Sequence, residues 1–273
     1  MNFLDKIKYK KIIIIIIYHI LYYNKKLNIF IIIYNRNKNI KMNASQIQAF
    51  KLYQDVFNSR THLLEMLEDR GYNVDHLKNY TSDEIKTMII EHSNGKFEVS
   101  ADIGPLDIFI EKTNNSIVEK IYVKYRLENK FKGTANVKSQ IDEIYEKHIG
   151  IKDTLIMINR NRLLMKVGAK EKTDEDFVND LYTSKNYFIQ LFGLENFLRN
   201  VSHHDFVPKH RVLSSTETQE LLKKFNCSGK NLPTIKRDDP QAKYVGLRLK
   251  QICEITRENV TSGITIHYRL CVS

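Results

Sequence analysis

Between residues 44 and 191 the hydrophobic side chains change repeatedly from one spacing to another. Steps of three and four residues, from Ile47 to Leu67, are typical of a helix that buries one face. Steps of two residues, as at Ile121, Val123 and Tyr125, are typical of a strand. The expected elements are helices over 44–70, from 82, over 134–148 and from 173, with strands at 97–103, 106–110, 117–125, 154–158 and 187–191. Helices interleaved with strands predict an α/β domain in which helices pack on a sheet.

Local capping signals support these helix boundaries. Gly71 follows the first helix, at a position where a positive φ is wanted and only glycine adopts it freely. Thr81 and Glu84 form a capping box, and Asp176 stands at the third position of the helix that starts after Thr173. We therefore expect a helix to begin just after each of these threonines.

Residues 201–273 are predicted to form a second, smaller α+β module. Ser214 and Glu217 form a capping box, which predicts a helix to about Phe225 that buries Leu221, Leu222 and Phe225 itself. A second short helix is expected from Asp239, as N-cap, to Gly246. Pro240 fits its first position, because a missing N–H costs nothing there.

Two strands are expected to complete the module. A strand over 252–257 leads through a turn at 259–263 into a last strand whose side chains alternate strictly. This alternation predicts one buried face and one exposed face. We expect a buried face of Ile264, Ile266, Tyr268, Leu270 and Val272, and an exposed face of Thr265, His267, Arg269 and Cys271.

The length of 273 residues suits one large domain or two modest ones. We expect one domain over 42–200 and another over 201–273. The three cysteines, Cys227, Cys253 and Cys271, are too few for a disulfide framework and have no CxxC spacing, which favours reduced thiols.

The net charge of +11 is distributed unevenly along the chain. Residues 1–41 carry nine Lys or Arg and one Asp, residues 42–202 carry 22 basic and 24 acidic residues, and residues 203–273 carry twelve basic and seven acidic residues. A protein that binds nucleic acid on its own concentrates Lys and Arg on its folded domain, because phosphate neutralisation supplies most of the affinity. The faintly acidic middle of the chain argues against that class.

Residues 1–41 have a composition unlike the rest. Ile, Lys, Asn and Tyr account for 32 of these 41 residues, and Met42 follows directly. The codons of these four amino acids can consist almost wholly of A and T, as in a translated non-coding stretch. A mis-set start codon is the favoured interpretation, and a disordered or interfacial extension and a targeting segment are the alternatives. The apolar run over 12–23 is shorter than the roughly 20 residues that a membrane-spanning helix needs.

One stretch resembles the metal site of restriction-type nucleases. Pro105-Leu106-Asp107, followed by a strand that carries Lys124, is similar to the PD…(D/E)xK pattern, in which acids hold a divalent metal that activates water. Tyr122 stands where that pattern requires an acid, and Glu119 is five residues before Lys124 rather than two. Hard cations bind several oxygen ligands, and Asp107 is the only strong ligand in this stretch. The sequence therefore favours Asp107 as an ordinary charged residue at a strand end over a metal site.

The C-terminal module also carries a series of short motifs. H-x-x-x-V-P-x-H spans 203–210, L-P-x-I spans 232–235, D-P-x-A spans 239–242, and an aromatic-x-Gly motif spans 244–246. An R…T-x-G…Y-R ending consists of Arg257, Thr261, Gly263, Tyr268 and Arg269. This series resembles the assembly domain of RNA polymerase subunit five, which the three eukaryotic nuclear polymerases share and which has a counterpart in the archaeal polymerase.

The preceding residues resemble the jaw domain of the eukaryotic family members in fewer places. These are chiefly Asp69-Arg70-Gly71-Tyr72 and the segment that leads through Phe197 and Val201 to His204. The resemblance implies a nuclease-like fold without nuclease residues, on a non-catalytic subunit that docks on the largest polymerase subunit and flanks downstream DNA. It implies no catalytic residue, cofactor or metal in this chain, because the Mg²⁺ and nucleotide chemistry belong to the two large subunits.

The resemblance also suggests partner-binding residues and a source. The candidates are Leu232, Pro233, Asp239, Pro240, Arg257, Thr261, Gly263 and Arg269. Tyr268 is expected to pack inside, and Arg269 to face outward toward a partner. Departures from the family's R-P-S-E-T-A-G-R-Y-x-x-Y segment occur at Glu258, Asn259, Val260, Ser262, Ile264 and Thr265. Archaeal members lack the jaw, so a eukaryotic enzyme, or one from a large DNA virus, is expected.

Two alternatives come from other functional classes. A metal-dependent nuclease would use Asp107, and a membrane-tethered adaptor would use residues 1–41. His203, His204 and His210 have no cysteines at zinc-like spacing, which favours hydrogen-bonded histidines over a metal site. A polymerase subunit is expected in the nucleus if cellular, and in the virion or host cytoplasm if viral.

Overall fold

The fold is described from a computed structural model, which covers residues 44–93, 104–114, 117–127, 134–160, 165–167, 170–259 and 263–273. The described residues from Leu52 onward belong to one compact unit, and those up to Lys51 belong to another. The segment 1–41, the predicted strand at 97–103 and the candidate residue Thr261 lie outside the described residues. Within the described part of the chain, no helix has the length and apolar character to cross a bilayer.

A long helix, α2 (Ala44–Asp69), forms the start of the described chain. Its most deeply buried side chains are Leu52, Val56, Leu63, Met66 and Leu67. The predicted inward residues Tyr53 and Phe57 pack against the same core but stay partly exposed. Gly71 follows the helix with φ +84°, as predicted.

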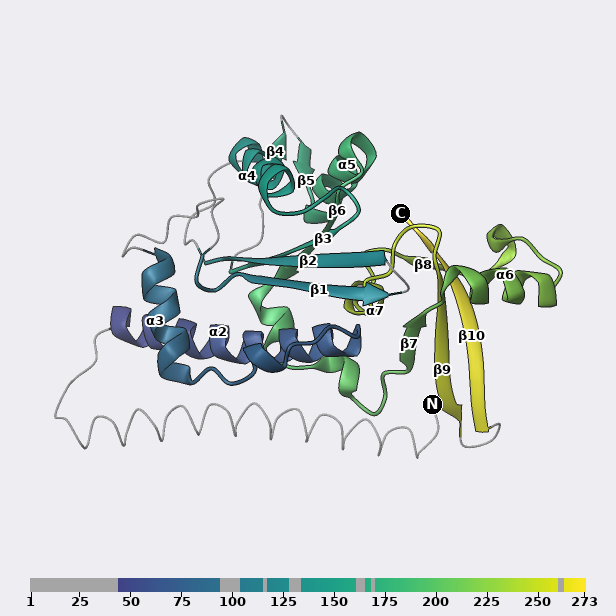
Figure 1. The fold of residues 1–273 in the computed structure, drawn as a ribbon, viewed down its shortest axis with the longest axis horizontal. Coiled ribbons are helices and arrows are strands. Elements are labelled where there is room, and N and C mark those ends of the chain that lie inside the picture. Colours follow the sequence, from purple (N-terminus) through teal and green to yellow (C-terminus); the bar gives the residue numbers. More distant parts are fainter. Residues whose placement is uncertain are drawn as a thin grey trace. The chain divides into compact units, whose positions relative to one another are not determined.

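The first sheet has four strands in the order β1-β2-β3-β6. β1 (Ile108–Asn114) is antiparallel to β2 (Ile117–Arg126), while β3 (Thr154–Asn159) and β6 (Phe188–Gly193) continue the sheet in parallel. Helices cover both faces of the sheet (Figure 1). Every residue of β3 is buried, as expected for a central parallel strand.

Alternation along β2 and β3 divides the core into two layers. Val123 and Ile156 point to the side of α2 and α3 (Ser82–Ser93). Tyr122 and Leu155 point to the other side, where α4 (Thr134–Lys147) and α5 (Asp174–Lys185) pack. The predicted α/β fold is therefore confirmed for this part of the chain. The sequence did not predict a short hairpin of β4 (Met165–Val167) and β5 (Lys170–Lys172), because each strand has only three residues.

The second sheet has the order β7-β9-β10-β8. Its strands are β7 (Lys209–Val212), β9 (Ile252–Asn259), β10 (Gly263–Val272) and β8 (Thr234–Lys236), of which β8 is parallel to β10 and the others are antiparallel neighbours. One face packs on α6 (Ser215–Lys224), and the other packs around α7 (Pro240–Tyr244). The 3-10 turns are η1 (Asp75–Leu77), η2 (Leu194–Phe197), η3 (Val201–His203) and η4 (Gly229–Asn231).

The predicted burial of the last strand and of Phe225 is partly wrong. Ile264 is 68% exposed, Ile266 is 52% exposed and Phe225 is 49% exposed, whereas Cys271, expected on the exposed face, is only 2% exposed. Beyond the residues that pair with β7 and β8, the sheet consists of the β9–β10 ribbon alone, and α6 does not reach Ile264 or Ile266. Near Cys271, both faces of the sheet are covered.

Each predicted capping box forms in the structure. Glu84 accepts a hydrogen bond from the Thr81 N–H at 2.7 Å, and Thr173 exchanges the equivalent contacts with Asp176. Ser214 and Glu217 form the box at the start of α6, where Arg211 also binds the Glu217 carboxylate at 2.6 Å. Hydrogen bonds from the Ser214 backbone and then from Arg211 lower the pKa of Glu217 to about 2.

The α6 cap predicts a defined acid sensitivity. A carboxylate whose folded-state pKa lies below its ordinary value of 4.5 stabilises the fold above that value, and this contribution is lost as the pH falls toward 2. Glu217→Gln should remove this part of the pH dependence, measured as the free energy of unfolding in urea between pH 2 and 7. Glu220→Gln, on the same helix, is the control and should retain it. An identical acid profile for both variants would contradict the assignment.

Candidate docking site

The nuclease-like position holds a buried ion pair. Lys124 Nζ lies 2.7 Å from Asp107 Oδ2, and both side chains are at most 2% exposed. Tyr122, which replaces the acid of the nuclease pattern, donates its hydroxyl to the same oxygen at 2.9 Å, and the Gly104 N–H donates at 2.7 Å. Among the described residues no group of three His, Cys, Asp or Glu side chains could hold a metal. The Asp107 carboxylate is therefore engaged in structural contacts.

This ion pair generates a stability prediction. Lys124→Met leaves the Asp107 carboxylate buried without its cation and should lower the free energy of unfolding by about 3–5 kcal/mol. The double variant Asp107→Asn/Lys124→Met should lose less than Lys124→Met alone, because the uncompensated charge is gone. Urea unfolding followed by circular dichroism measures both. A Lys124→Met variant as stable as the parent would contradict a structural role for the pair.

Arg70 joins the first sheet to the C-terminal module. Its Nε donates to the Tyr244 carbonyl at 2.8 Å, and its Nη2 donates to the Lys243 carbonyl at 2.6 Å and to Gln190 Oε1 at 2.9 Å. Gln190, on β6, donates to the same Lys243 carbonyl at 3.0 Å. Burial lowers the pKa of the guanidinium to about 10, so it stays charged at neutral pH. One side chain thus holds the end of α7 against the sheet.

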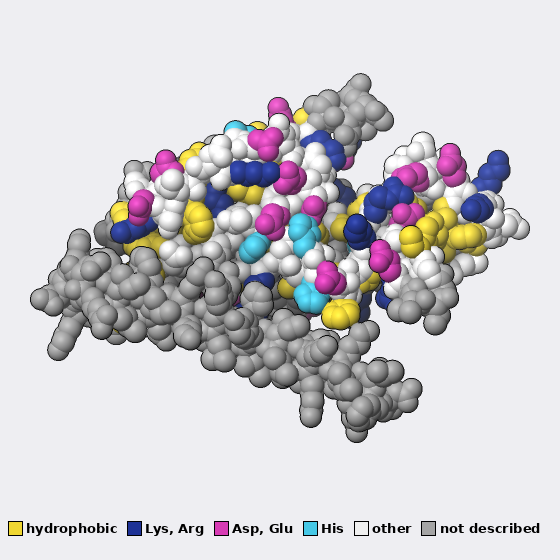
Figure 2. Space-filling model, turned by 90° about the horizontal axis from the view of Figure 1, so that it is seen from below, with side chains coloured by type: hydrophobic (Ala, Val, Ile, Leu, Met, Phe, Trp, Pro, Cys, Tyr) yellow, Lys and Arg dark blue, Asp and Glu magenta, His cyan; other side chains and the backbone are white. Residues whose placement is uncertain are grey.

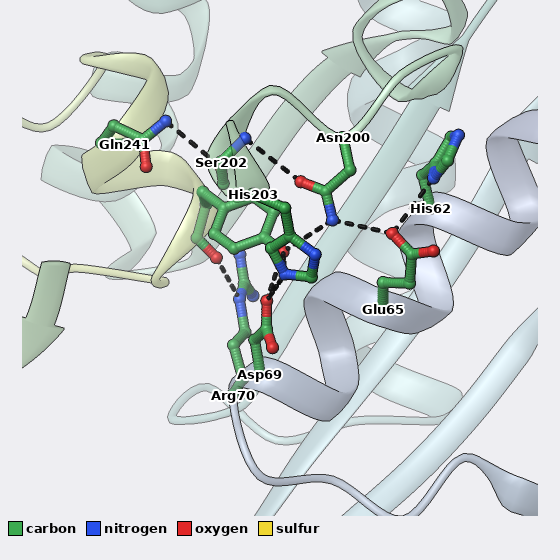
Figure 3. A network of polar contacts seen from close by, with 9 residues as sticks. His62, Glu65, Asp69, Arg70, Asn200, Ser202, His203 and Gln241 are labelled. Atoms are coloured by element: carbon green, nitrogen blue, oxygen red, sulfur yellow. Dashed lines mark hydrogen bonds and ion pairs between the residues drawn. The ribbon is translucent and has the colours of Figure 1, made fainter. Parts of the chain in front are cut away.

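We call the contacts of Arg70 with α7 and Gln190 the joint. A polar network extends this joint along α2 (Figure 3). Asp69 accepts a hydrogen bond from the Tyr244 hydroxyl at 2.5 Å and pairs with His203 Nε2 at 2.6 Å. Asn200 links Glu65, at 2.8 Å, to the Tyr244 hydroxyl, at 3.2 Å. Burial and the bond to Asp69 raise the pKa of Tyr244, which keeps its hydroxyl protonated as a donor. The last turns of α2 therefore bind both η3 and α7.

Two further arginines hold the module on the sheet. Arg248 donates to the Lys152 carbonyl at 2.8 Å and lies over the Phe188 ring, 4.3 Å from its centroid. Arg237 bonds Asn179 on α5. The sequence did not single out Arg237 or Arg248, because an isolated arginine carries no local signal of its distant partner. Gly246 did carry a signal: it has φ +73°, and an added Cβ would lie 3.3 Å from the Arg70 guanidinium carbon.

The predicted partner-binding residues fall into two groups. Asp239 caps α7, Pro240 begins it, and the Pro233 carbonyl accepts the Leu270 N–H at 2.8 Å, while Leu232 packs against the α6 core. These four residues thus have structural contacts within the module. Arg257 and Gly263 are exposed on the β9–β10 ribbon, and Arg269 is half-buried.

Tyr268 and Arg269 differ in part from the expectation. Tyr268 is half-buried, with its ring edge-to-face on Phe225 at 5.9 Å between centroids. Arg269, expected to face outward, also donates to the Thr234 carbonyl at 3.2 Å, so part of its side chain braces β8. Its contact with a partner remains a prediction.

A groove of about 1470 Å³ runs between the two sheets. The segment from Ser202 to Ser214 lines one side, and Tyr72, Lys112 and Glu119 line the other. Figure 2 shows histidine, acidic and basic side chains mixed on the side of the molecule that it views. The sequence did not predict this groove, because it forms only where residues distant in the chain meet.

The hydrogen bonds of the Arg70 guanidinium lead to a prediction about stability. Arg70→Lys keeps the charge but loses the planar fork that reaches two carbonyls, and should lower the free energy of unfolding by about 1.5–3 kcal/mol. Arg199→Lys is a suitable control, since Arg199 is exposed. Urea unfolding compares the two. Equal stability of both variants would show that Arg70 does not hold the joint.

The C-terminal module matches a known protein family. Residues 199–271 match the family model described as RNA polymerase Rpb5, C-terminal domain. The matched residues include every strand of the second sheet, apart from the last residue of β10.

Several curated relatives extend the similarity beyond this module. The chain is 24% identical over 231 residues to the RNA polymerases I, II and III subunit RPABC1 of Caenorhabditis elegans, covering 85% of this chain and all of that protein. It is 29% identical over 232 residues to the RNA polymerases IV and V subunit 5B of Arabidopsis thaliana, covering 85% and 94% of the two chains. A Dictyostelium discoideum subunit rpabc1 is 39% identical over 88 residues, which are 32% of this chain and 45% of that protein. Together with the family motifs, these similarities identify the chain as a member of the RNA polymerase subunit five family.

Proposed function

We propose that this chain, a non-catalytic subunit of a DNA-directed RNA polymerase, docks on the largest polymerase subunit and flanks downstream DNA. One observation carries the proposal: residues 199–271, which match the family model, include the second sheet, apart from the last residue of β10, and its helices. Other polymerase subunits are its partners. The largest subunit and the DNA are the specific neighbours that we propose.

We further propose a division of labour within the chain. Residues 201–273 act as the assembly domain, and residues 42–200 act as the jaw. The contacts of Arg70, Arg237 and Arg248 support this division, because they hold the module on the first sheet. A fixed joint of this kind would set the position of the jaw once the module is docked.

The charge distribution favours docking over independent DNA binding. Residues 42–202 carry 22 basic and 24 acidic residues, too balanced for strong attraction to phosphates. Residues 203–273 carry twelve basic and seven acidic residues, which suits an acidic surface on a partner. The jaw would therefore lie beside DNA that the assembled polymerase holds. We propose the nucleus as its place of work in a cell, and the virion or host cytoplasm for a viral enzyme.

Neither alternative function gains support from the described residues. The nuclease hypothesis requires a metal at Asp107, whose carboxylate is engaged by Lys124, Tyr122 and the Gly104 N–H. The membrane-tethered adaptor depends on residues 1–41, which lie outside the described residues.

Native purification tests the proposed function. A tagged full-length chain should elute in a stoichiometric complex several times larger than its own 32.2 kDa and should recover the largest polymerase subunit. Arg257→Glu should lower that recovery several-fold, because it reverses an exposed charge on the ribbon. Lys224→Glu makes the same charge change on α6 and serves as the control. Elution of the parent chain alone, identified by mass spectrometry, would refute the proposal.

A further inference from the structure

Strand β10 has an open edge along most of its length. It pairs with β9 over residues 263–270, but with β8 only over residues 270–272. Within the described part of the chain, residues 263–269 therefore have a neighbouring strand on one side only. An unpaired edge is a template for another strand, since its N–H and C=O groups are free to pair.

The direction of the backbone groups follows from the hydrogen bonds at the end of the strand. Cys271 N–H donates to the Gln251 carbonyl at 2.9 Å, on the β9 side, whereas Leu270 N–H donates to the Pro233 carbonyl at 2.8 Å, on the β8 side. The two directions alternate along an antiparallel strand. The N–H and C=O groups of Ile264, Ile266 and Tyr268 therefore point to the open edge.

The side chains on one face of this edge are apolar. Ile264 is 68% exposed and Ile266 is 52% exposed, and they share their face with the half-buried Tyr268. Figure 2 shows hydrophobic side chains gathered on the lobe that the second sheet and α6 form. Proteins usually protect an edge strand with lysine, proline or a bulge. Two exposed isoleucines on an open edge instead favour a partner that covers them.

The opposite face of the same ribbon is basic. The β9–β10 register pairs Thr265 with Arg257, and places His267 and Arg269 on this face as well. His210 lies nearby, with its Nδ1 2.7 Å from the Pro208 carbonyl. Burial lowers the pKa of His210, the Pro208 carbonyl and the Asp239 carboxylate oppose this shift, and the charges of Arg257 and Arg269 add to it. Among the described residues, Arg257 and His267 form no ion pair with a carboxylate.

We propose that residues 264–268 of β10 receive an extended segment of another polymerase subunit as an added strand. The side chains of that segment alternate, with apolar groups beside Ile264 and Ile266 and carboxylates beside Arg257, His267 and Arg269. In strand addition, main-chain hydrogen bonds supply affinity and alternate side chains supply specificity. This inference rests on the proposed function, because it takes the occupant from the polymerase.

A second copy of the chain fits the edge less well. Two β10 strands related by a twofold axis would place the basic faces of both copies on the same side of the joined sheet. Like charges across neighbouring strands are destabilising. An acidic segment from a different subunit removes this repulsion and supplies partners for the arginines.

Hydrogen exchange at single-amide resolution tests the added strand directly. The free full-length chain is compared with the same chain in the purified polymerase complex. The amides of residues 264, 266 and 268 should exchange more than about tenfold more slowly in the complex, because they gain hydrogen bonds there. The amides of residues 265, 267 and 269 already face β9 and should be protected in both samples, which makes them an internal control.

The possible outcomes separate the two proposals. A chain that assembles but leaves amides 264, 266 and 268 unprotected overturns the strand addition and leaves the docking function standing. A chain that never assembles refutes the docking function itself. Protection in the free chain that rises with its concentration identifies a second copy as the occupant, which also overturns the inference.

Matched variants extend the test to the side chains. Ile264→Thr/Ile266→Thr keeps the β-branched shape that strands favour but makes the face polar. We expect this variant to lose the protection of amides 264, 266 and 268 and to retain several-fold less of the polymerase after a high-salt wash. Val118→Thr makes the same change at a side chain that is 47% exposed on β2, and should behave as the parent does. Full protection and retention in the double variant would overturn the role of the isoleucines.

Discussion

The contact of the Arg70 guanidinium with the Lys243 and Tyr244 carbonyls determines how the two sheets of this protein are held. Arg70 directly follows α2, so the longest helix of the first sheet also binds the short helix of the second. Asp69 adds its bonds to Tyr244 and His203 at the same point. These contacts hold the C-terminal module on the first sheet, as the proposed division into an assembly domain and a jaw requires.

The structure separates residues that shape the module from residues that a partner can reach. Asp239, Pro240 and Gly246 serve α7 and its contact with Arg70. The exposed ribbon of β9 and β10 instead presents isoleucines on one face and cations on the other. Family motifs alone do not make this distinction, because they contain both kinds of residue.

Local signals predicted most of the elements, and the errors have a common physical cause. Thr81, Thr173 and Ser214 marked helix starts correctly, because a capping box involves only four consecutive residues. Ile264 and Ile266 were predicted to be buried but are exposed, and Cys271 was predicted to be exposed but is buried. These predictions failed because burial depends on which other elements cover a strand. The roles of Arg237 and Arg248 were missed for the same reason, since their partners are far away in the sequence.

Cross-linking mass spectrometry of the assembled polymerase tests the central claim most directly. The account predicts that lysines of the C-terminal module, such as Lys209, Lys236 and Lys250, cross-link to the largest subunit. Lysines at the far side of the first sheet, such as Lys86 on α3, should not. Cross-links to the largest subunit that come from α3 and spare the C-terminal module would contradict the assignment of docking to residues 201–273.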